Sequence, residues 1–255
     1  VSTACASGND AIATAATLLR AGEADAMVVM GGESAGSALL LQSLARALAL
    51  TNNPDPATAC RPFDAERNGF VVGEGGAALI LETEEHALER NAVILAEVAG
   101  CASNNDAFHT VAPRDDGDGA RRCMIAAMKN AGLTPEDIDY INAHGTSTGK
   151  GDAIEAMAIH AALGERAKQI GVSSTKGATG HLMGAGGVVE AVACIQAIRT
   201  GILPPTLHYQ TPDPLCDLDV IPNQARHQAV HTAMSNAFGF GGQNACVIFK
   251  EYRGQ

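Results

Sequence analysis

The strongest candidate for chemistry in this sequence is Cys5, within the segment VSTACASG at residues 1–8. Its thiol falls where an extended apolar segment meets the first turn of a predicted helix. Helix N-terminal amides favour negative charge, so we expect a lowered thiol pKa and amides able to hold an oxyanion. A strand-to-helix turn also projects a side chain outward. Cys5 is therefore either a nucleophile or a small buried cysteine that opens a helix.

Two further segments carry imidazoles beside polar turns. His144 follows a predicted strand and precedes a Gly/Thr/Ser-rich turn, whose Thr146 and Thr148 hydroxyls could bind a polar substrate arm. The alternative is a loop histidine capped by local hydroxyls. Lys176 and His181 lie on a flexible Gly-rich loop and could stabilise developing negative charge. This loop lacks the G-x-x-x-x-G-K pattern of a phosphate-binding loop.

A fourth segment, SNAFGFGGQN at 235–244, surrounds Phe240 with glycines. Such a mobile turn suits a gate over an apolar pocket and a backbone N–H aimed at a reacting carbonyl; a tight hairpin turn with a buried Phe is the alternative. Cys5, His144 and His181 could also converge on a metal. Zinc would need further ligands at clear spacing, and none occurs, so we expect no metal.

These segments must be positioned by alternating helices and strands. Buried strands between helices of this length are typical of a layered α/β fold. Helices are predicted over 5–21, 39–50, 83–91, 118–131, 152–163 and 184–200, and buried or extended strands over 26–30, 69–81, 94–99, 140–143, 170–174 and, around a Gly-rich turn, 232–249.

An internal echo links 5–22 with 184–201, each preceded by a Val-Ser phrase. Two copies of strand, loop and small-residue helix suggest a duplicated half-fold with pseudo-twofold symmetry, unless Ala/Gly-rich helices are alike by chance. The matching positions are Ala6 and Ala185, Gly8 and Gly187, Arg20 and Arg199, and Gly22 and Gly201.

Composition excludes several classes of protein. Of the 255 residues, 46% are hydrophobic and 18% charged, which is typical of a globular chain, and the net charge of −11 disfavours nucleic acid and anionic membranes. The seven cysteines form no C-x-x-C pair, as expected of reduced, mostly buried thiols in a cytoplasmic protein. We find no signal peptide and no apolar run of membrane-spanning length.

Taken together, the phrases resemble β-ketoacyl-acyl carrier protein synthases of the elongating I/II type, II-like, in the thiolase superfamily. The resemblance covers essentially the whole chain and implies an α/β, thiolase-like αβαβα layered fold. Family members carry a substantial portion before the cysteine, so we interpret the chain as a C-terminal fragment with the N-terminal part missing. Residues 1–91 would be the remainder of the N-terminal half, with the nucleophile, and 92–255 the C-terminal half, with both catalytic histidines. The phrases lie at 1–8, 61–76, 142–155, 173–187, 204–206 and 235–244.

The resemblance implies a role for each candidate. Cys5 would accept the acyl group, and the backbone N–H groups of Cys5 and Phe240 would form an oxyanion hole, with Phe240 also as gate. His144 and His181 would donate hydrogen bonds to a thioester oxygen, and Lys176 would orient this network. Substrate-binding residues would be Thr146, Thr148, Gly239 and Gly241, the threonines contacting the phosphopantetheine arm, and Asp152 and Glu155 would support the active-site lysine and histidine.

The function implied is a 3-oxoacyl-[acyl-carrier-protein] synthase, which condenses malonyl-acyl carrier protein with a Cys-bound acyl chain in fatty acid biosynthesis. A polyketide ketosynthase, or an inactive fragment, is the alternative. The partner would be acyl carrier protein, acyl- and malonyl-loaded, and the full-length protein a homodimer. No resident cofactor is expected, because phosphopantetheine arrives on the carrier. Three departures from the family pattern, at 33–45, Gly149-Lys150 and Gln243, leave chain-length preference open and remove no catalytic group.

We expect the isolated 255-residue chain to be unstable or inactive, because buried strands would be left with unpaired edges. Thermal unfolding and an activity assay on this chain check the expectation. A cooperative transition accompanied by full activity would contradict it.

Overall fold

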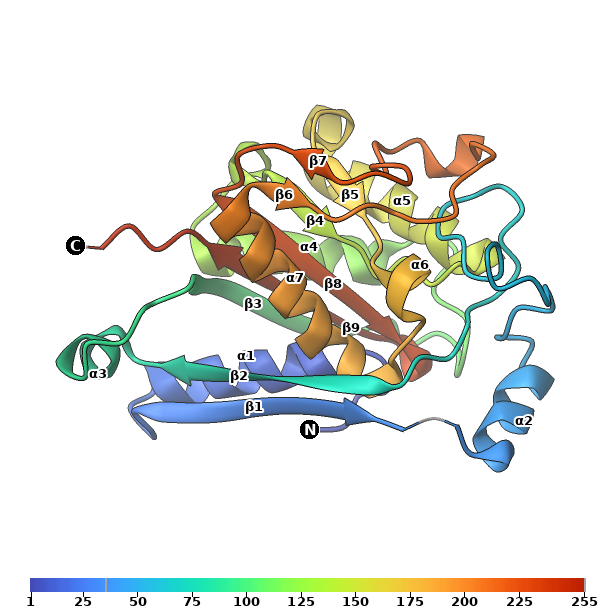
Figure 1. The fold of residues 1–255 in the computed structure, drawn as a ribbon. Coiled ribbons are helices and arrows are strands. Elements are labelled where there is room, and N and C mark those ends of the chain that lie inside the picture. The colour runs from blue at the N-terminus through green and yellow to red at the C-terminus, as the bar shows by residue number, and fades with distance from the viewer. Residues whose placement is uncertain (35, 255) are drawn as a thin grey trace.

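The helices and strands of the chain stack in four layers (Figure 1). A computed structural model describes residues 1–34 and 36–254. An antiparallel ribbon, a pair of helices, a five-stranded sheet and a second pair of helices follow one another, which confirms the predicted α/β fold class. The ribbon is β1 (Ala26–Glu33) and β2 (Gly75–Glu82), the inner helices are α1 (Ser7–Arg20) and α7 (Gly186–Thr200), and the outer helices are α4 (Asp118–Ala131) and α5 (Gly149–Leu163).

The five-stranded sheet brings the chemistry-bearing segments to one edge. Strand β4 is parallel to both of its neighbours, β5 and β8, so the carboxyl ends of these three strands meet at the same edge. The segments with His144, Lys176 and Phe240 all follow those ends. The sheet order is β3 (Glu97–Asn105), β9 (Gln243–Lys250), β8 (Thr232–Gly239), β4 (Tyr140–Asn142) and β5 (Gly171–Ser173).

Smaller elements connect the layers. In the part of the chain that the structure describes, no helix is long and apolar enough to cross a membrane. The remaining helices are α2 (Ala38–Arg46), α3 (Glu84–Glu89) and α6 (Lys176–Thr179), and β6 (Ile202–Leu203) pairs with β7 (Arg226–His227).

Most predicted elements are present with shifted ends. The helix at 118–131 is confirmed residue for residue, and two strands flank the Gly-rich turn within 232–249 as expected. The strand expected at 94–99 instead runs over 97–105. The segment of Lys176 is not the flexible loop that the glycines indicated, because residues 176–179 form the short helix α6.

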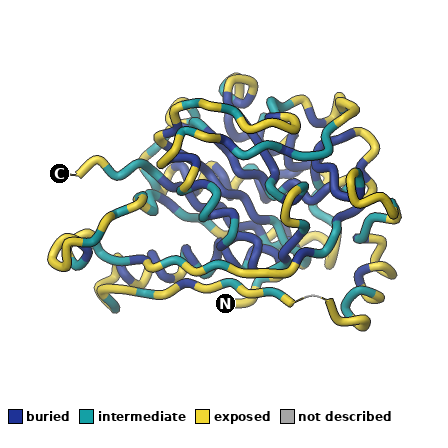
Figure 2. The backbone as a smooth tube through the Cα atoms, in the orientation of Figure 1, coloured by how far each residue is buried: buried dark blue, intermediate teal, exposed yellow. Residues whose placement is uncertain are grey.

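The prediction of a buried strand at 26–30 is wrong about burial. Strand β1 runs to Glu33, and only Val29 is buried, whereas Val28 and Met30 are 64% and 74% exposed. Successive side chains of a strand point to opposite faces, and no described helix covers the outer face of this ribbon (Figure 2). The fifth layer of the expected αβαβα arrangement is therefore not formed by residues 1–34 and 36–254.

Helices α1 and α7 touch through glycines at equivalent positions of the internal echo. A Cβ atom on Gly8 would lie 2.7 Å from the backbone N of Val188, and one on Gly187 would lie 2.6 Å from the backbone N of Asn9. The contact is reciprocal, as a pseudo-twofold relation between the two helices requires. Only glycine allows the backbones this close, so the echo reflects a packing constraint.

We predict that Gly8→Ala destabilises the chain by about 2 kcal/mol, because the added methyl group overlaps backbone atoms that cannot rotate away. Denaturant unfolding measures the change. Gly32→Ala is the matched control, since a Cβ there meets nothing within 4 Å. Equal stability of the two variants would contradict the proposed packing.

Candidate active site

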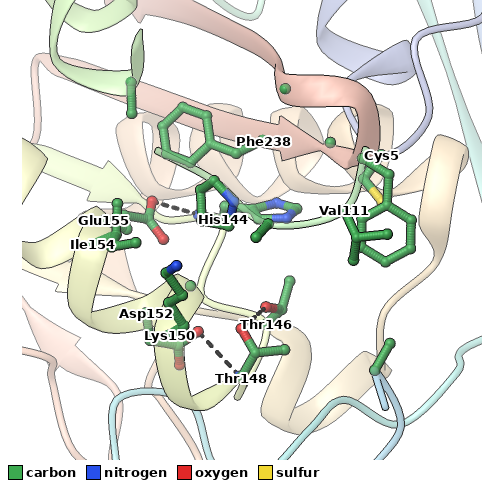
Figure 3. Close-up of a pocket in the computed structure, with 18 of the residues that line it drawn as sticks. Cys5, Val111, His144, Thr146, Thr148, Lys150, Asp152, Ile154, Glu155 and Phe238 are labelled. Carbon is green, nitrogen blue, oxygen red and sulfur yellow. Dashed lines mark hydrogen bonds between the residues drawn. The ribbon is translucent and has the colours of Figure 1, made fainter. Parts of the chain in front are cut away.

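A cavity of about 240 Å³ opens at the edge where the parallel strands end (Figure 3). Its inner wall contains Cys5, His144 and His181. Its remaining walls come from the β4–α5 loop, the first turns of α5, the β3–α4 loop, the segment after α2 and the β8–β9 turn. Far-separated segments of the chain thus meet around one thiol.

The turn before α1 holds Cys5 at the inner end of this cavity. Ala4 has a positive φ of 50°, an unusual conformation for a residue with a side chain, so the chain bends sharply just before the cysteine. Cys5 is 5% exposed, and its Sγ lies 3.1 Å from Nε2 of His181. The backbone N–H groups of Phe240 and of Cys5 itself also interact with the sulfur. Both amides expected in an oxyanion hole therefore face the thiol.

The expected lowering of the Cys5 pKa is wrong. Burial raises the pKa of the thiol to about 11, and the opposing effects of the Lys176 charge and the Phe240 N–H are smaller. Burial, and then the Lys176 charge, also holds the pKa of His181 well below its usual range. The cysteine and its histidine therefore face one another as neutral groups near neutral pH, and the thiol needs a proton acceptor when it reacts.

The two imidazoles are held edge to face. The rings of His144 and His181 lie 5.4 Å apart at 85°, with Phe70 against His181 and Phe238 against His144. Burial, then Lys176, lowers the pKa of His144 as well. Both Nδ1 atoms are buried and have no hydrogen-bond partner among the described residues. Two desolvated neutral imidazoles thus lie side by side next to the thiol.

Glu155 holds the backbone that carries the first histidine. Its carboxylate accepts hydrogen bonds from the N–H of His144 at 2.8 Å and of Gly145 at 2.7 Å (Figure 3). Burial raises the pKa of Glu155 to about 7, although these two N–H groups oppose the shift. This supporting role for His144 acts through the backbone, since none of the hydrogen bonds that Glu155 makes to described residues involves the ring.

Asp152, one helical turn earlier, holds the next part of the same loop. It accepts hydrogen bonds from the N–H of Ser147 at 3.1 Å, of Thr148 at 3.3 Å and of Phe63 at 2.8 Å. Burial raises its pKa, which these amides and the Arg67 charge oppose. The two acids of α5 thus support different residues of one loop.

The lysine is supported by a residue that the sequence analysis missed. The Lys176 ammonium forms a buried ion pair with Glu190 on α7. Among the described residues, neither Asp152 nor Glu155 hydrogen-bonds this ammonium, although the Lys176 charge does act on Glu155. The only signal in the sequence was one acidic residue among the small and apolar residues of the first turns of a helix.

The expected substrate-binding residues divide into two groups. The hydroxyls of Thr146 and Thr148 lie 3.1 Å apart on the cavity wall. Gly239 also lines the cavity, and a Cβ there would lie 3.0 Å from the backbone N of Cys5, so a side chain would displace Cys5. Gly241 is not among the described residues that line the cavity. Phe240 is partly buried against it, where a gate would lie.

Charged residues surround the outer part of the cavity. Lys150 forms an ion pair with Asp115 of the β3–α4 loop. Arg114, on the same loop, pairs with Asp116. These exposed pairs contribute little stability, so the cations can exchange their carboxylates for another anion.

The fold is a layered α/β one, and a buried cysteine and two neutral imidazoles share one cavity, next to a paired lysine whose charge acts on all three. These features define a thiolase-like protein with a ketosynthase type of site. Family models agree: the N-terminal domain of β-ketoacyl synthase matches residues 1–87 and the C-terminal domain matches residues 95–210. The chain belongs to the β-ketoacyl synthase family. The boundary between halves at residues 91 and 92 stays a prediction.

Curated relatives are similar over nearly the whole chain. It is 46% identical over 250 residues to the 3-oxoacyl-[acyl-carrier-protein] synthase 2 of Staphylococcus aureus (strain COL), covering 98% of this chain and 60% of the relative. Identity to the protein of the same name from Synechocystis sp. is 50% over 252 residues, covering 98% and 61%. The chain thus spans about three fifths of the length of these relatives.

Solved ketosynthases share the fold. One is the ketosynthase of a type II polyketide synthase, in complex with its acyl-carrier protein, with a TM-score of 0.96 and 40% identity over 99% of this chain and 62% of the other. A β-ketoacyl synthase from Burkholderia phymatum STM815 gives a TM-score of 0.93 and 38% identity, covering 99% and 61%.

We predict that alkylation of Cys5 by chloroacetamide accelerates about tenfold per pH unit from pH 7 upward, because the thiolate is the reactive form and its fraction rises towards a pKa of about 11. Lys176→Met should slow the reaction further at each pH, since removing the nearby positive charge raises the thiol pKa. Mass spectrometry of the Cys5 peptide gives the rate. A plateau near pH 7 would mean that a thiolate–imidazolium pair is the resting state.

Proposed function

We propose that this chain carries the reacting groups of a 3-oxoacyl-[acyl-carrier-protein] synthase of fatty acid biosynthesis. One observation supports this most: the Cys5 thiol lies 3.1 Å from His181, whose ring lies 5.4 Å from that of His144, in one desolvated cavity. The names of the curated relatives point to the same activity.

The first step forms an acyl-enzyme. The Cys5 sulfur attacks the carbonyl carbon of an acyl thioester, and its proton passes to the neutral imidazole of His181 and then to the departing carrier thiol. Negative charge develops on the carbonyl oxygen, where the N–H groups of Cys5 and Phe240 can receive it. One thioester is exchanged for another, and the sulfur ends without charge in a site that disfavours charge.

The second step creates the carbon nucleophile. A malonyl thioester loses CO₂, and the electrons of the broken C–C bond move into an enolate whose oxygen accepts hydrogen bonds from His144 and His181. Imidazoles that are already neutral can donate such bonds without carrying charge, and the nearby Lys176 ammonium stabilises the developing anion. The enolate carbon then attacks the acyl carbon on Cys5, and the C–S bond breaks, which releases a 3-oxoacyl thioester two carbons longer. The Cys5 sulfur leaves as a thiolate and takes up one proton from solvent to restore the neutral thiol.

Acyl carrier protein is the proposed partner. Its phosphopantetheine arm would enter past Thr146 and Thr148 and would be part of the substrate, so no resident cofactor is proposed. A relative of known structure was solved with its acyl-carrier protein, which supports this class of partner. We also propose that the full-length protein is a cytoplasmic homodimer, as the resemblance implies.

A polyketide ketosynthase is the second candidate. The observation in its favour is the TM-score of 0.96 to a ketosynthase bound to a hexaketide. Turnover of saturated medium-length acyl thioesters in preference to polyketide thioesters would favour the fatty acid role.

We predict that an acyl-carrier thioester adds one acyl mass to the full-length wild-type protein and none to its Cys5→Ala variant, because among the described cysteines the Cys5 thiol faces both amides and His181. Intact-protein mass spectrometry checks this. Cys101→Ala, which removes a thiol that is more exposed than Cys5, should be labelled like the wild type. Equal labelling of wild type and Cys5→Ala would sink the catalytic assignment.

A second variant separates the two steps. His144→Ala should slow malonyl decarboxylation by about 100-fold or more and leave acylation of Cys5 largely intact, because His144 faces the enolate and His181 contacts the thiol. Released CO₂ and the acyl mass shift are measured on the same samples. Parallel loss of both signals would argue against this division.

A further inference from the structure

We propose that Arg67 is a positioning residue, which fixes the cavity wall formed by Thr146 and Thr148 and so controls how tightly the substrate's pantetheine arm is held. The inference rests on the proposed function for the identity of that arm. Arg67 lies within the RPFD…NGF phrase, to which no role was assigned from the sequence.

Arg67 forms hydrogen bonds to the backbone of the threonine segment, the part of the β4–α5 loop that carries Thr146 and Thr148. Its Nε donates a hydrogen bond to the carbonyl oxygen of Thr148 at 3.0 Å, and one terminal nitrogen donates to that of Gly149 at 2.8 Å. Two donors of one planar group therefore hold two successive carbonyls. Lysine cannot reproduce this arrangement, because its ammonium is a single point on a flexible stem.

The other side of the guanidinium is anchored as firmly. The second terminal nitrogen donates to the carbonyl of Asp64 at 2.8 Å and to the carboxylate of Asp213 at 2.6 Å, while Asp152 lies 3.9 Å from Nε. The Arg67 side chain is only 3% exposed. A buried cation with partners on all sides has one position, so it can transmit that position to the loop.

The threonine segment needs such support. Ser147 has a positive φ of 67°, which costs free energy for a residue with a side chain. Asp152 holds the N–H groups of Ser147 and Thr148, and Arg67 holds the carbonyl of Thr148. The Asp152 carboxylate thus binds N–H groups of this short segment and the Arg67 guanidinium binds one of its carbonyl oxygens. Together they stabilise its strained conformation.

The histidine end of the loop is held separately. His144 and Gly145 are bonded to Glu155, and none of the described contacts of Arg67 reaches Cys5 or His181. Loosening Arg67 should therefore shift the threonines while the thiol and its imidazole stay in place. A change at Arg67 should therefore alter recognition of the arm and leave the intrinsic reactivity of the thiol unchanged.

The test compares two alkylating reagents with the same reactive group: chloroacetamide, and the chloroacetyl amide of a pantetheine analogue in which an amine replaces the terminal thiol. Wild-type Cys5 should react faster with the pantetheine reagent. In Arg67→Lys that preference should fall about tenfold, whereas the rate with chloroacetamide should stay within about twofold of wild type. Arg166→Lys is the matched control: Arg166 also donates to a backbone carbonyl, that of Ile138, away from the cavity, and should keep both rates.

Each outcome decides the proposal. An unchanged preference in Arg67→Lys, or an equal fall with both reagents in a variant that still unfolds cooperatively, would overturn it, and so would a wild type without preference. If Arg67→Lys does not fold, Asp213→Asn is used instead, and should lower the preference in the same direction by a smaller factor. A wild type that prefers the pantetheine reagent yet takes no acyl group from a carrier thioester would count against the proposed condensation and leave the role of Arg67 standing.

Discussion

Burial has the largest effect on the protonation states around the thiol, and the next largest is that of the buried charge of Lys176. This charge lowers the pKa of His144 and of His181 and opposes the rise in the pKa of Cys5 that burial causes. A lone buried ammonium is costly, and its ion pair with Glu190 offsets that cost. Burial, with this charge as the smaller cause, keeps both imidazoles neutral, as the proposed hydrogen bonds to an enolate require, while the Lys176 charge remains available to a developing anion.

This ion pair depends on the way the helices pack. Glu190 is on α7, one turn beyond the glycine that touches α1, and α1 begins just after Cys5. The close approach of Gly8 and Gly187 therefore sets the distance between the helix that positions the nucleophile and the helix that supports the lysine. The echo seen in the sequence is a structural repeat whose two copies have different tasks: one presents a thiol and the other a carboxylate.

The sequence predicted which residues form the site more accurately than it predicted their protonation states. Cys5, His144, His181 and Phe240 each follow a recognisable local phrase, and the structure brings them to one cavity. The direction of the Cys5 pKa shift was wrong, because a local pattern indicates the helix terminus and not the burial that outweighs it. Glu190 was missed for a related reason: an ion pair between residues 14 positions apart in different elements leaves no local pattern. The exposure of the β1–β2 ribbon was predicted wrongly for a similar reason, because the burial of a strand depends on which layers cover it.

The β4–α5 loop shows how one short segment can serve binding and chemistry without coupling them. Asp152 and Glu155 lie three residues apart on the first turns of α5, so they share one face of the helix, yet one holds the threonines and the other the histidine. Their surroundings also differ. Arg67 stands beside Asp152, whereas two amides and the more distant Lys176 oppose the rise in the pKa of Glu155 that burial causes. With a pKa of about 7, Glu155 is the acid that a small rise in proton concentration neutralises, and a neutral carboxyl holds the two amides less strongly. Because its pKa is raised, the folded state binds this proton more tightly than the unfolded chain does, and the contribution of Glu155 to stability increases as the pH falls below 7. Its hydrogen bonds to the histidine segment weaken over the same range. The histidine end of the loop therefore depends on a carboxyl with a pKa of about 7, whereas the threonine end is held both by Asp152 and by the permanently charged Arg67.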